Sequence, residues 1–378
     1  MNWLSKQLEI SHSNHSPLRP MEGLRGVAVF LVFLLHYCSL IEPYIIEKSF
    51  EITILHTIHR LGNVGVDLFF VLSGFLIYGT LIRKSKTNFF QYLMRRIVRI
   101  YPTFLIIFLI YLCLSFIFPN ENKIPNNLWD GGFYIIQNLL LLPGLFDITP
   151  IITVAWSLSY EFFYYLFIPL IIALLSLRNW TLKQRIIFWC TVSVIGFFYF
   201  EIHGGPYRLL MFISGILLYE VLENKLINPP KHLGTLSLIV ALVSYSYAPY
   251  LELSGIIQIA ILYVFFFIVC LEAFSRNNGS AIWLNISPIR WLGNMSYSYY
   301  LMHGLTLKGC FMFIALVIEP NKQFDTIFWF AMPLLFLATL ISSFILFILV
   351  EKPFSLKNKN KKAILEIDKS KHVKTLTT

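Results

Sequence analysis

Long apolar runs separated by short polar segments form the chain. Residues 22–40 read EGLRGVAVFLVFLLHYCSL, and runs of similar length recur to residue 350. About 20 helical residues cross about 30 Å of hydrocarbon, because a helix rises about 1.5 Å per residue. The pattern therefore predicts an all-α, polytopic membrane bundle of about ten transmembrane helices, at 22–40, 65–82, 99–118, 155–177, 186–201, 207–222, 233–250, 256–274, 294–318 and 327–350.

A shorter apolar stretch at 133–146 differs from these runs. Gln137, Asn138 and the Pro143-Gly144 pair interrupt it. A stretch of that length is typical of a re-entrant or interfacial segment rather than a full crossing. We therefore expect a short helix here that does not span the membrane.

The distribution of lysine and arginine predicts the orientation. Cytoplasmic loops of membrane proteins carry an excess of these residues. If both termini are cytoplasmic, the inner segments hold 24 of the 30 lysines and arginines, and the outer loops hold only Lys48, Arg60, Lys123 and Lys322. Counting 133–146 as a further span would invert every later loop and remove this asymmetry.

Composition supports a single membrane domain. The chain is 57% hydrophobic and 13% charged, whereas a soluble domain carries roughly 25% charged residues. We predict a cytoplasmic segment at 1–21, a membrane domain at 22–353 and a basic, disordered cytoplasmic tail at 354–378. The net charge of +10 is explained by the lysines and arginines that gather in the cytoplasmic loops beside the lipid bilayer. No nucleic-acid partner is therefore expected. The five cysteines form no CxxC pair, which indicates neither disulfides nor a thiol metal site.

Two polar residues stand in the first span. Arg25 and His36 are eleven residues apart, which at about 100° per residue places them on one helix face, about 16 Å apart along the axis. An ionisable residue in the membrane costs roughly 2.5–3.5 kcal/mol and is a functional candidate. The alternative is a snorkelling arginine with a histidine that hydrogen-bonds to a neighbouring helix.

Other spans add candidates for acid–base and nucleophilic chemistry. Asp67 and Glu161 are predicted in the outer half, with His36, where a carboxylate could orient and charge the histidine. Ser73 and His303 are predicted near the middle of their spans. A purely structural polar network is the alternative for these residues.

A cluster of cations precedes the third span. Arg95, Arg96 and Arg99 lie at the predicted level of Arg25 on the cytoplasmic side, and Arg96 and Arg99 share a helix face. Such a cluster could hold the phosphates of an anionic cofactor. Ordinary cytoplasmic anchoring is the alternative. Neither a P-loop nor a dinucleotide GxGxxG motif is present.

Five of these segments, in order and with suitable spacing, resemble the acyltransferase 3 family of integral-membrane acyltransferases. The resemblance covers residues 18–353, nearly the whole chain. The segments that carry it are RPMEGLRGVAVFLVFLLH, GNVGVDLFFVLSGFLI, RRIVRIYP, WSLSYEFFYYLF and LGNMSYSYYLMH.

The resemblance implies a ten-helix enzyme of the bacterial inner membrane. Such an enzyme moves an acyl group, usually acetyl, from cytoplasmic acyl-CoA to a hydroxyl of a glycan outside, and needs no metal. The Arg-x10-His element of the family matches Arg25 and His36, and its Arg-x-x-Arg element matches Arg96 and Arg99. The glutamate that follows Trp-Ser-Leu-Ser matches Glu161.

These correspondences give each candidate a role. Arg25, Arg96 and Arg99, with Arg95 beside them, would hold the phosphates of acetyl-CoA. His36 would act as general base on the acceptor hydroxyl, oriented by Glu161 or Asp67. A covalent acyl relay through Ser73 or His303 is the alternative.

The sequence departs from the family pattern at one position. Members often carry a second acid after the glutamate, where Phe162 stands here, which puts in doubt a role that needs two adjacent acids. Some members carry an extracytoplasmic hydrolase-like domain after the bundle, and we expect none here. If acceptor delivery needs such a domain, we expect a separate partner protein to supply it.

Two other classes of function stay open on the sequence. A transporter or flippase could use Arg25, His36, Glu161 and His303 as a proton or substrate pathway, although the internal repeats typical of transporters are not evident. A structural or sensory subunit is the third class. For an enzyme, the acceptor could be lipopolysaccharide O-antigen, exopolysaccharide, a lipid-linked sugar or peptidoglycan.

Overall fold

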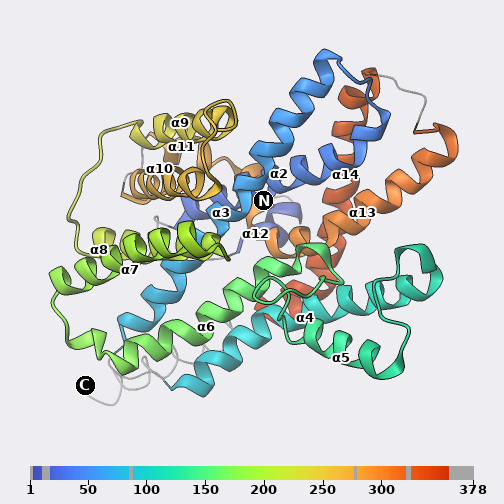
Figure 1. Cartoon of the computed structure of the whole chain (residues 1–378). Helices are drawn as coiled ribbons and strands as arrows, with labels where there is room; N and C mark the ends of the chain where they lie inside the picture. The colour runs from blue at the N-terminus through green and yellow to red at the C-terminus, as the bar shows by residue number, and fades with distance from the viewer. Residues whose placement is uncertain (1–2, 11–17, 85–87, 276–278, 321–324, 357–378) are drawn as a thin grey trace.

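A bundle of α-helices makes up the computed structural model, which describes residues 3–10, 18–84, 88–275, 279–320 and 325–356 (Figure 1). The predicted all-α class is confirmed. The helices are α1 (Trp3–Leu8), α2 (Leu18–Ile41), α3 (Phe50–Ile82), α4 (Phe89–Ile117), α5 (Leu128–Leu139), α6 (Trp156–Leu174), α7 (Leu182–His203), α8 (Met211–Glu223), α9 (Leu233–Tyr247), α10 (Gly255–Ser275), α11 (Ser280–Leu284), α12 (Ser287–Asn294), α13 (Ser296–Val317), α14 (Thr326–Leu346) and a π-helix (Phe347–Leu356).

Eight helical segments of the described chain are long and apolar enough to cross a membrane. They confirm eight of the predicted spans. The segments are Arg19–Tyr44, Phe50–Ile82, Phe89–Ile117, Thr153–Leu174, Leu182–His203, Gly255–Ser275, Ser296–Val317 and Thr326–Leu356.

Of the other two predicted spans, 207–222 corresponds to a 3-10 turn (Tyr207–Leu210) followed directly by α8, and 233–250 corresponds to α9. The α-helices α8 and α9 have 13 and 15 residues, or about 20 and 22 Å, which is less than the thickness of the hydrocarbon layer. Helix α8 is buried along nearly its whole length against α3, α7 and α10. A helix enclosed by protein is not required to match the lipid thickness.

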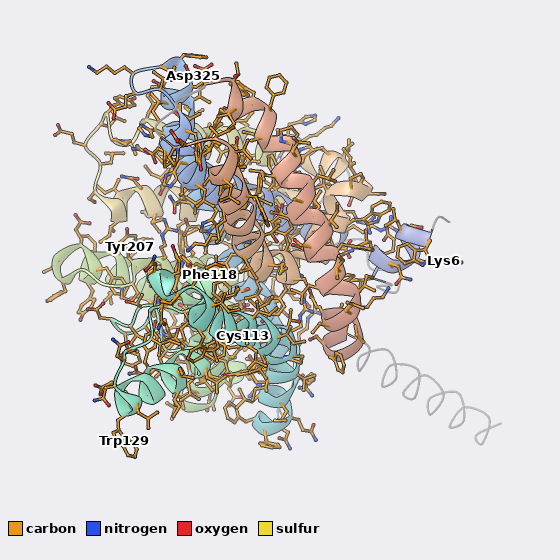
Figure 2. The ribbon with its side chains drawn as sticks, turned by 90° about the vertical axis from the view of Figure 1, so that its right-hand side faces the viewer. Lys6, Cys113, Phe118, Trp129, Tyr207 and Asp325 are labelled. Atoms are coloured by element: carbon orange, nitrogen blue, oxygen red, sulfur yellow. The ribbon has the colours of Figure 1, made fainter. Side chains whose placement is uncertain are left out.

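Polar contacts define two ends of the bundle. We call the first the amino-terminal end, where the contacts join Arg83 with Glu223, Arg290 with Glu9 and Lys352 with Gln7. At the opposite end they join Ile46 with Asp325, Arg60 with Ser246, Lys308 with Glu121 and Ser254 with Glu201. Figure 2 likewise shows Lys6 on the other side of the molecule from Trp129 and Tyr207. Successive helices, α8 and α9 included, therefore run between the same two ends.

The short helix α5 begins earlier than the sequence pattern predicted. The Asn127 side chain accepts a hydrogen bond from the Trp129 amide at 3.2 Å and starts the helix, five residues before the apolar stretch at 133. The helix ends at Leu139, ahead of a turn in which Gly144 has a φ of 92°. Its 12 residues are too few to span. Its side chains Leu128, Trp129, Phe133 and Ile136 are exposed.

The last predicted boundary is also shifted. The π-helix continues to Leu356, three residues beyond the predicted end of the membrane domain at 353. It packs against α4 and α14 and is tied to α1 because the Lys352 ammonium donates to Gln7 at 2.6 Å. The remainder of the predicted tail lies outside the described residues.

Helix α3 lies between α2 and α8 (Figure 1). Gly74 and Gly215 allow the contact with α8, because a Cβ atom on Gly74 would lie 2.0 Å from the Phe212 carbonyl oxygen. On the other flank, α2 also packs on α12 and α13. Small residues permit this close approach of helix backbones, which places polar side chains from several helices within reach of α2.

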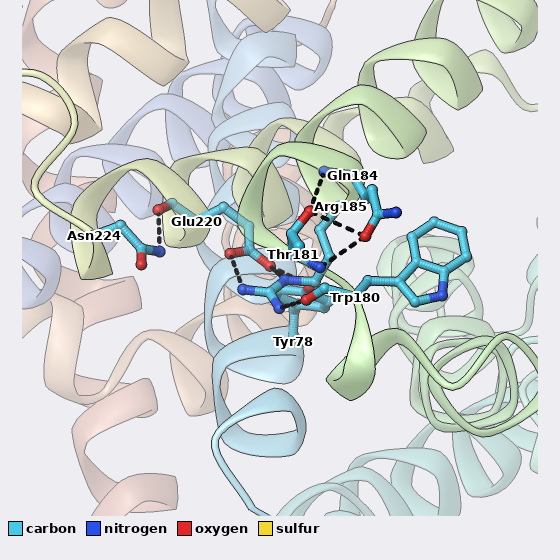
Figure 3. Close-up of polar contacts among 7 residues, drawn as sticks. All are labelled: Tyr78, Trp180, Thr181, Gln184, Arg185, Glu220 and Asn224. Carbon is cyan, nitrogen blue, oxygen red and sulfur yellow. Dashed lines mark hydrogen bonds and ion pairs between the residues drawn. The ribbon is translucent and has the colours of Figure 1, made fainter.

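A buried ion pair joins α7 to α8. Arg185 donates to both carboxylate oxygens of Glu220, at 2.6 and 3.0 Å, and to the Trp180 carbonyl at 2.8 Å (Figure 3). The Tyr78 hydroxyl of α3 donates to the same carboxylate. The Glu220 side chain is only 1% exposed, so its charge depends on these donors.

We expect Arg185→Met to destabilise the bundle by about 3–5 kcal/mol, because it leaves the Glu220 carboxylate buried without its cation. The midpoint of thermal unfolding in detergent measures the change. Arg83→Met is the matched control, since the pair of Arg83 with Glu223 is exposed on both sides and should contribute about 1 kcal/mol or less. Equal losses in the two variants would contradict the assignment.

Candidate functional site

Two of the three predicted arginines of α4 point into the bundle. The Arg96 guanidinium lies 4.9 Å from the ring centre of Tyr165 and 5.3 Å from that of Tyr92, which are cation–π distances. Arg99, one turn further, is partly buried. Arg95 is exposed, although its four-residue spacing places it beside Arg99 on the helix surface. Exposure, and not helix face, distinguishes Arg95 from the partly buried pair.

Arg99 is held by an acid that the sequence analysis did not select. Its Nη1 lies 2.7 Å from Oε1 of Glu351, a carboxylate of the π-helix whose side chain is fully buried. The Ser298 amide and hydroxyl donate to the other oxygen of Glu351, at 3.0 and 2.6 Å. The Arg99 guanidinium also lies 5.7 Å from the Tyr297 ring centre. The ion pair thus joins α4, α13 and the π-helix.

Arg25 of α2 faces the same place. It interacts electrostatically with Arg99, Glu351 and Glu161. The backbone around Arg25 is fixed by α12, because a Cβ atom on Gly26 would lie 2.1 Å from the Ile289 carbonyl oxygen. We call Arg25, Arg96 and Arg99 the arginine cluster; the structure brings these predicted residues together.

Glu161 lies beside the arginine cluster. Its Oε1 accepts hydrogen bonds from the Tyr165 hydroxyl and, at 3.4 Å, from the Ser73 hydroxyl. Tyr165 therefore contacts both Glu161 and Arg96. Among the described residues no contact joins Glu161 to His36. The predicted role of Glu161 in orienting His36 thus has no contact to support it, whereas its pairing with Ser73 does.

The two predicted histidines are neighbours. The ring centres of His36 and His303 lie 5.1 Å apart, at an angle of 52°. His303 is fully buried, and its Nδ1 lies 2.9 Å from the Tyr299 carbonyl oxygen. The Nε2 atom of His303 has no hydrogen-bond partner within the described chain. We call these two residues the histidine pair.

Asp67 occupies a different place from the one predicted. Its fully buried carboxylate lies 3.5 Å from Nη1 of Arg208. Arg208, which the sequence analysis counted only as a cation within a span, also interacts electrostatically with Tyr245 and Tyr160. Arg208 lies in the 3-10 turn Tyr207–Leu210 that precedes α8, and among the described residues no contact joins Asp67 to His36. The predicted orienting role of Asp67 is not supported by this geometry.

The sequence contains only a partial indication of the residues that were not selected as candidates. Glu351 is an acid at the end of the last apolar run, immediately before lysine and proline, and the predicted topology assigned it to the cytoplasmic boundary. The contacts of Tyr165 and Tyr297 with the arginines had no signal in the sequence, because aromatic residues make up 17% of the chain. Only their contacts with arginines distinguish them.

The comparisons with known proteins agree on one family. Residues 20–348 match a family model described as an acyltransferase domain. Acyltransferase MdmB of Streptomyces mycarofaciens is 24% identical over 371 residues, which cover 89% of this chain and 91% of that protein. Peptidoglycan O-acetyltransferase OatA of Listeria monocytogenes is 26% identical over 320 residues, which cover 75% of this chain and 48% of that protein.

A third relative has the same partial coverage. O-acetyltransferase OatA of Staphylococcus aureus is 27% identical over 295 residues, covering 64% of this chain and 45% of that protein. The chain thus spans about half the length of the two OatA relatives and nearly all of MdmB. No solved structure matches the chain.

We expect Glu351→Gln to destabilise the protein by about 3 kcal/mol or more, because it removes the anion from a buried ion pair and leaves Arg99 uncompensated. Ser298→Ala should cost only about 1 kcal/mol, since the Ser298 amide still donates to the carboxylate. Thermal unfolding in detergent compares the two variants. A smaller effect for Glu351→Gln than for Ser298→Ala would argue against the ion pair.

Proposed function

The chain belongs to the acyltransferase 3 family of membrane-bound acyltransferases, and on that basis we propose that it transfers an acetyl or other acyl group across the membrane. The donor is cytoplasmic acyl-CoA, and the acceptor is a hydroxyl group of an extracytoplasmic glycan. The observation that carries the proposal is the presence, on one face of α2, of Arg25 in the arginine cluster and His36 in the histidine pair.

The donor binds at the amino-terminal end of the bundle. That end carries most of the lysines and arginines outside the spans, so the positive-inside rule assigns it to the cytoplasm. Arg25, Arg96 and Arg99 hold the phosphates of CoA through charge-assisted hydrogen bonds. The tyrosine rings beside Arg96 and Arg99 keep the guanidinium groups in place. Arg95 is exposed and contributes at most long-range attraction.

The chemistry takes place further along α2. His36 lies about 16 Å beyond Arg25 along the helix axis, a distance that the extended arm of an acyl-CoA bridges. His36 removes the proton from the acceptor hydroxyl as the oxygen forms a bond to the thioester carbon. The carbon–sulfur bond breaks, and the proton passes to the thiolate of CoA. Ester and free CoA are the products, with no net proton released.

The class of acceptor follows from the proposed orientation and from the relatives. The family relatives with acetyltransferase names include one named for peptidoglycan. We propose a surface glycan such as O-antigen, exopolysaccharide or peptidoglycan, or its lipid-linked precursor, and a bacterial inner-membrane location. Family membership favours this enzyme over the transporter considered above.

Purified protein in liposomes tests the proposal directly. Radiolabelled acetyl-CoA is supplied on one side of the bilayer and soluble peptidoglycan or O-antigen fragments on the other. Label on the glycan across the bilayer supports acyl transfer. Uptake of an unmodified solute without acetylated product would instead support a transporter. Label that stays on the protein after denaturation would indicate a covalent relay, for which Ser73, beside Glu161, is the candidate.

Substitutions separate the donor site from the base. We expect His36→Ala to lower kcat by roughly 10²–10⁴-fold, the contribution of a positioned base, and Arg25→Ala to raise the KM for acetyl-CoA. Arg99→Gln should raise that KM as well, while Arg95→Gln serves as the matched control and leaves it nearly unchanged. Full transfer by folded His36→Ala and Arg25→Ala variants would refute both assignments.

A further inference from the structure

The hydrogen bond of His303 to its own helix fixes its tautomer. Nδ1 lies 2.9 Å from the Tyr299 carbonyl oxygen, which can only accept a hydrogen bond. Nδ1 therefore carries the proton, and in the neutral ring Nε2 must carry the lone pair. The stacking of the His303 ring on the Tyr299 ring, with centres 5.5 Å apart and planes 10° apart, holds the ring in this orientation.

The lone pair on Nε2 of His303 accepts no hydrogen bond from the described residues. The residue is fully buried, and Nε2 has no hydrogen-bond partner. An unsatisfied polar atom in an apolar interior costs free energy and calls for an explanation. Its aromatic neighbours, Tyr299 and Tyr300, use their hydroxyl groups elsewhere, on Thr339 and Ser157. The neighbouring ring is that of His36, whose nitrogens make no hydrogen bond to another side chain or backbone group within the described ranges.

We propose that His303 is a positioning residue that sets the tautomer of His36. This inference rests on the proposed function, because it gives His36 the role of base. Nε2 of His303, whose ring lies 5.1 Å from that of His36, accepts a hydrogen bond from one N–H of His36. The other ring nitrogen of His36 then bears the lone pair and faces the acceptor hydroxyl. Two histidines and the Tyr299 carbonyl thus form one directed chain of hydrogen bonds.

This chain of hydrogen bonds also stabilises the charge that develops during the reaction. When His36 takes the proton of the acceptor hydroxyl, it becomes an imidazolium, and the lone pair on Nε2 of His303 remains hydrogen-bonded to it. His303 itself gains no proton. The proton on His36 then moves to the CoA thiolate as the carbon–sulfur bond breaks. The orienting partner in a serine-protease triad acts in the same way on its histidine.

Two amide variants distinguish this role from a structural one. The amide of asparagine lies near the position of Nδ1, so His303→Asn can keep the hydrogen bond to the Tyr299 carbonyl but offers nothing at Nε2. The amide of glutamine lies near the position of Nε2, so His303→Gln can still accept from His36. A positioning role predicts that His303→Gln retains more activity; a purely structural role predicts the reverse.

The experiment measures CoA release from acetyl-CoA by the full-length protein in liposomes. Soluble peptidoglycan fragments serve as acceptor, and water alone gives the hydrolysis rate. We expect His303→Asn to lower kcat by about 10- to 100-fold, the lower part of the range for a positioned base, with the KM for acetyl-CoA unchanged. His303→Gln should lie closer to the wild type. His56→Gln, which changes an exposed histidine of α3 whose Nε2 lies 3.0 Å from the Glu42 carboxylate, is the control.

Three results would overturn the inference. One is a wild-type kcat in His303→Asn, and another is His303→Asn more active than His303→Gln. The third is a rise in the KM for acetyl-CoA without a change in kcat. Thermal unfolding of each variant identifies a loss of activity that comes from misfolding, and added imidazole should then restore turnover in His303→Gly only if the ring itself is needed. If His36→Ala also keeps full activity, the proposed function fails; if it does not, only the role of His303 fails.

Discussion

The ion pair between Arg99 and Glu351 is the contact on which the arrangement of the candidate site depends. A charge in the interior of a lipid-surrounded bundle needs a partner, and Glu351 provides it from the last helix of the membrane domain. Because the Ser298 hydroxyl donates a hydrogen bond to the other oxygen of this carboxylate, the pair fixes α4, α13 and the π-helix together. Arg25 interacts electrostatically with the same carboxylate, so the position of Glu351 also affects the balance of charge within the arginine cluster.

Helix α2 connects this charged region to the histidine pair. Arg25 and His36 share one of its faces, and each meets side chains from a different part of the chain: Arg99 from α4, and His303 from α13. A helix is rigid over this length, so the two polar regions keep a fixed separation. A donor that binds at one end and an acceptor that arrives from the other can meet at His36 without a large movement of the bundle.

Hydropathy predicted most of the fold because eight segments are long and apolar enough to cross a membrane. It also identified the segment 207–222, which forms a 3-10 turn followed by α8, but it missed the start of α5. Helix α5 starts at the cap formed by Asn127. Arg25, Arg96, Arg99 and His36 were selected as candidates from helix periodicity and the family resemblance, and His303 from its position near the middle of its span. The contact of His36 with His303 and the pairing of Asp67 with Arg208 were not predicted, because periodicity gives the face of a helix but not which neighbour that face meets.

The membrane class, the family and the alignment of Arg25 with His36 can be predicted without a structure, since they follow from apolar length, motif order and the 3.6-residue repeat. The partners of those residues depend on how the helices pack. The contacts of Glu351, Tyr165 and Arg208 form only when distant helices pack together. The same is true of the contact between His303 and His36. Which helices pair depends on small residues that allow their backbones to come close, such as Gly74 and Gly215. Residues of this kind are distributed over the whole chain.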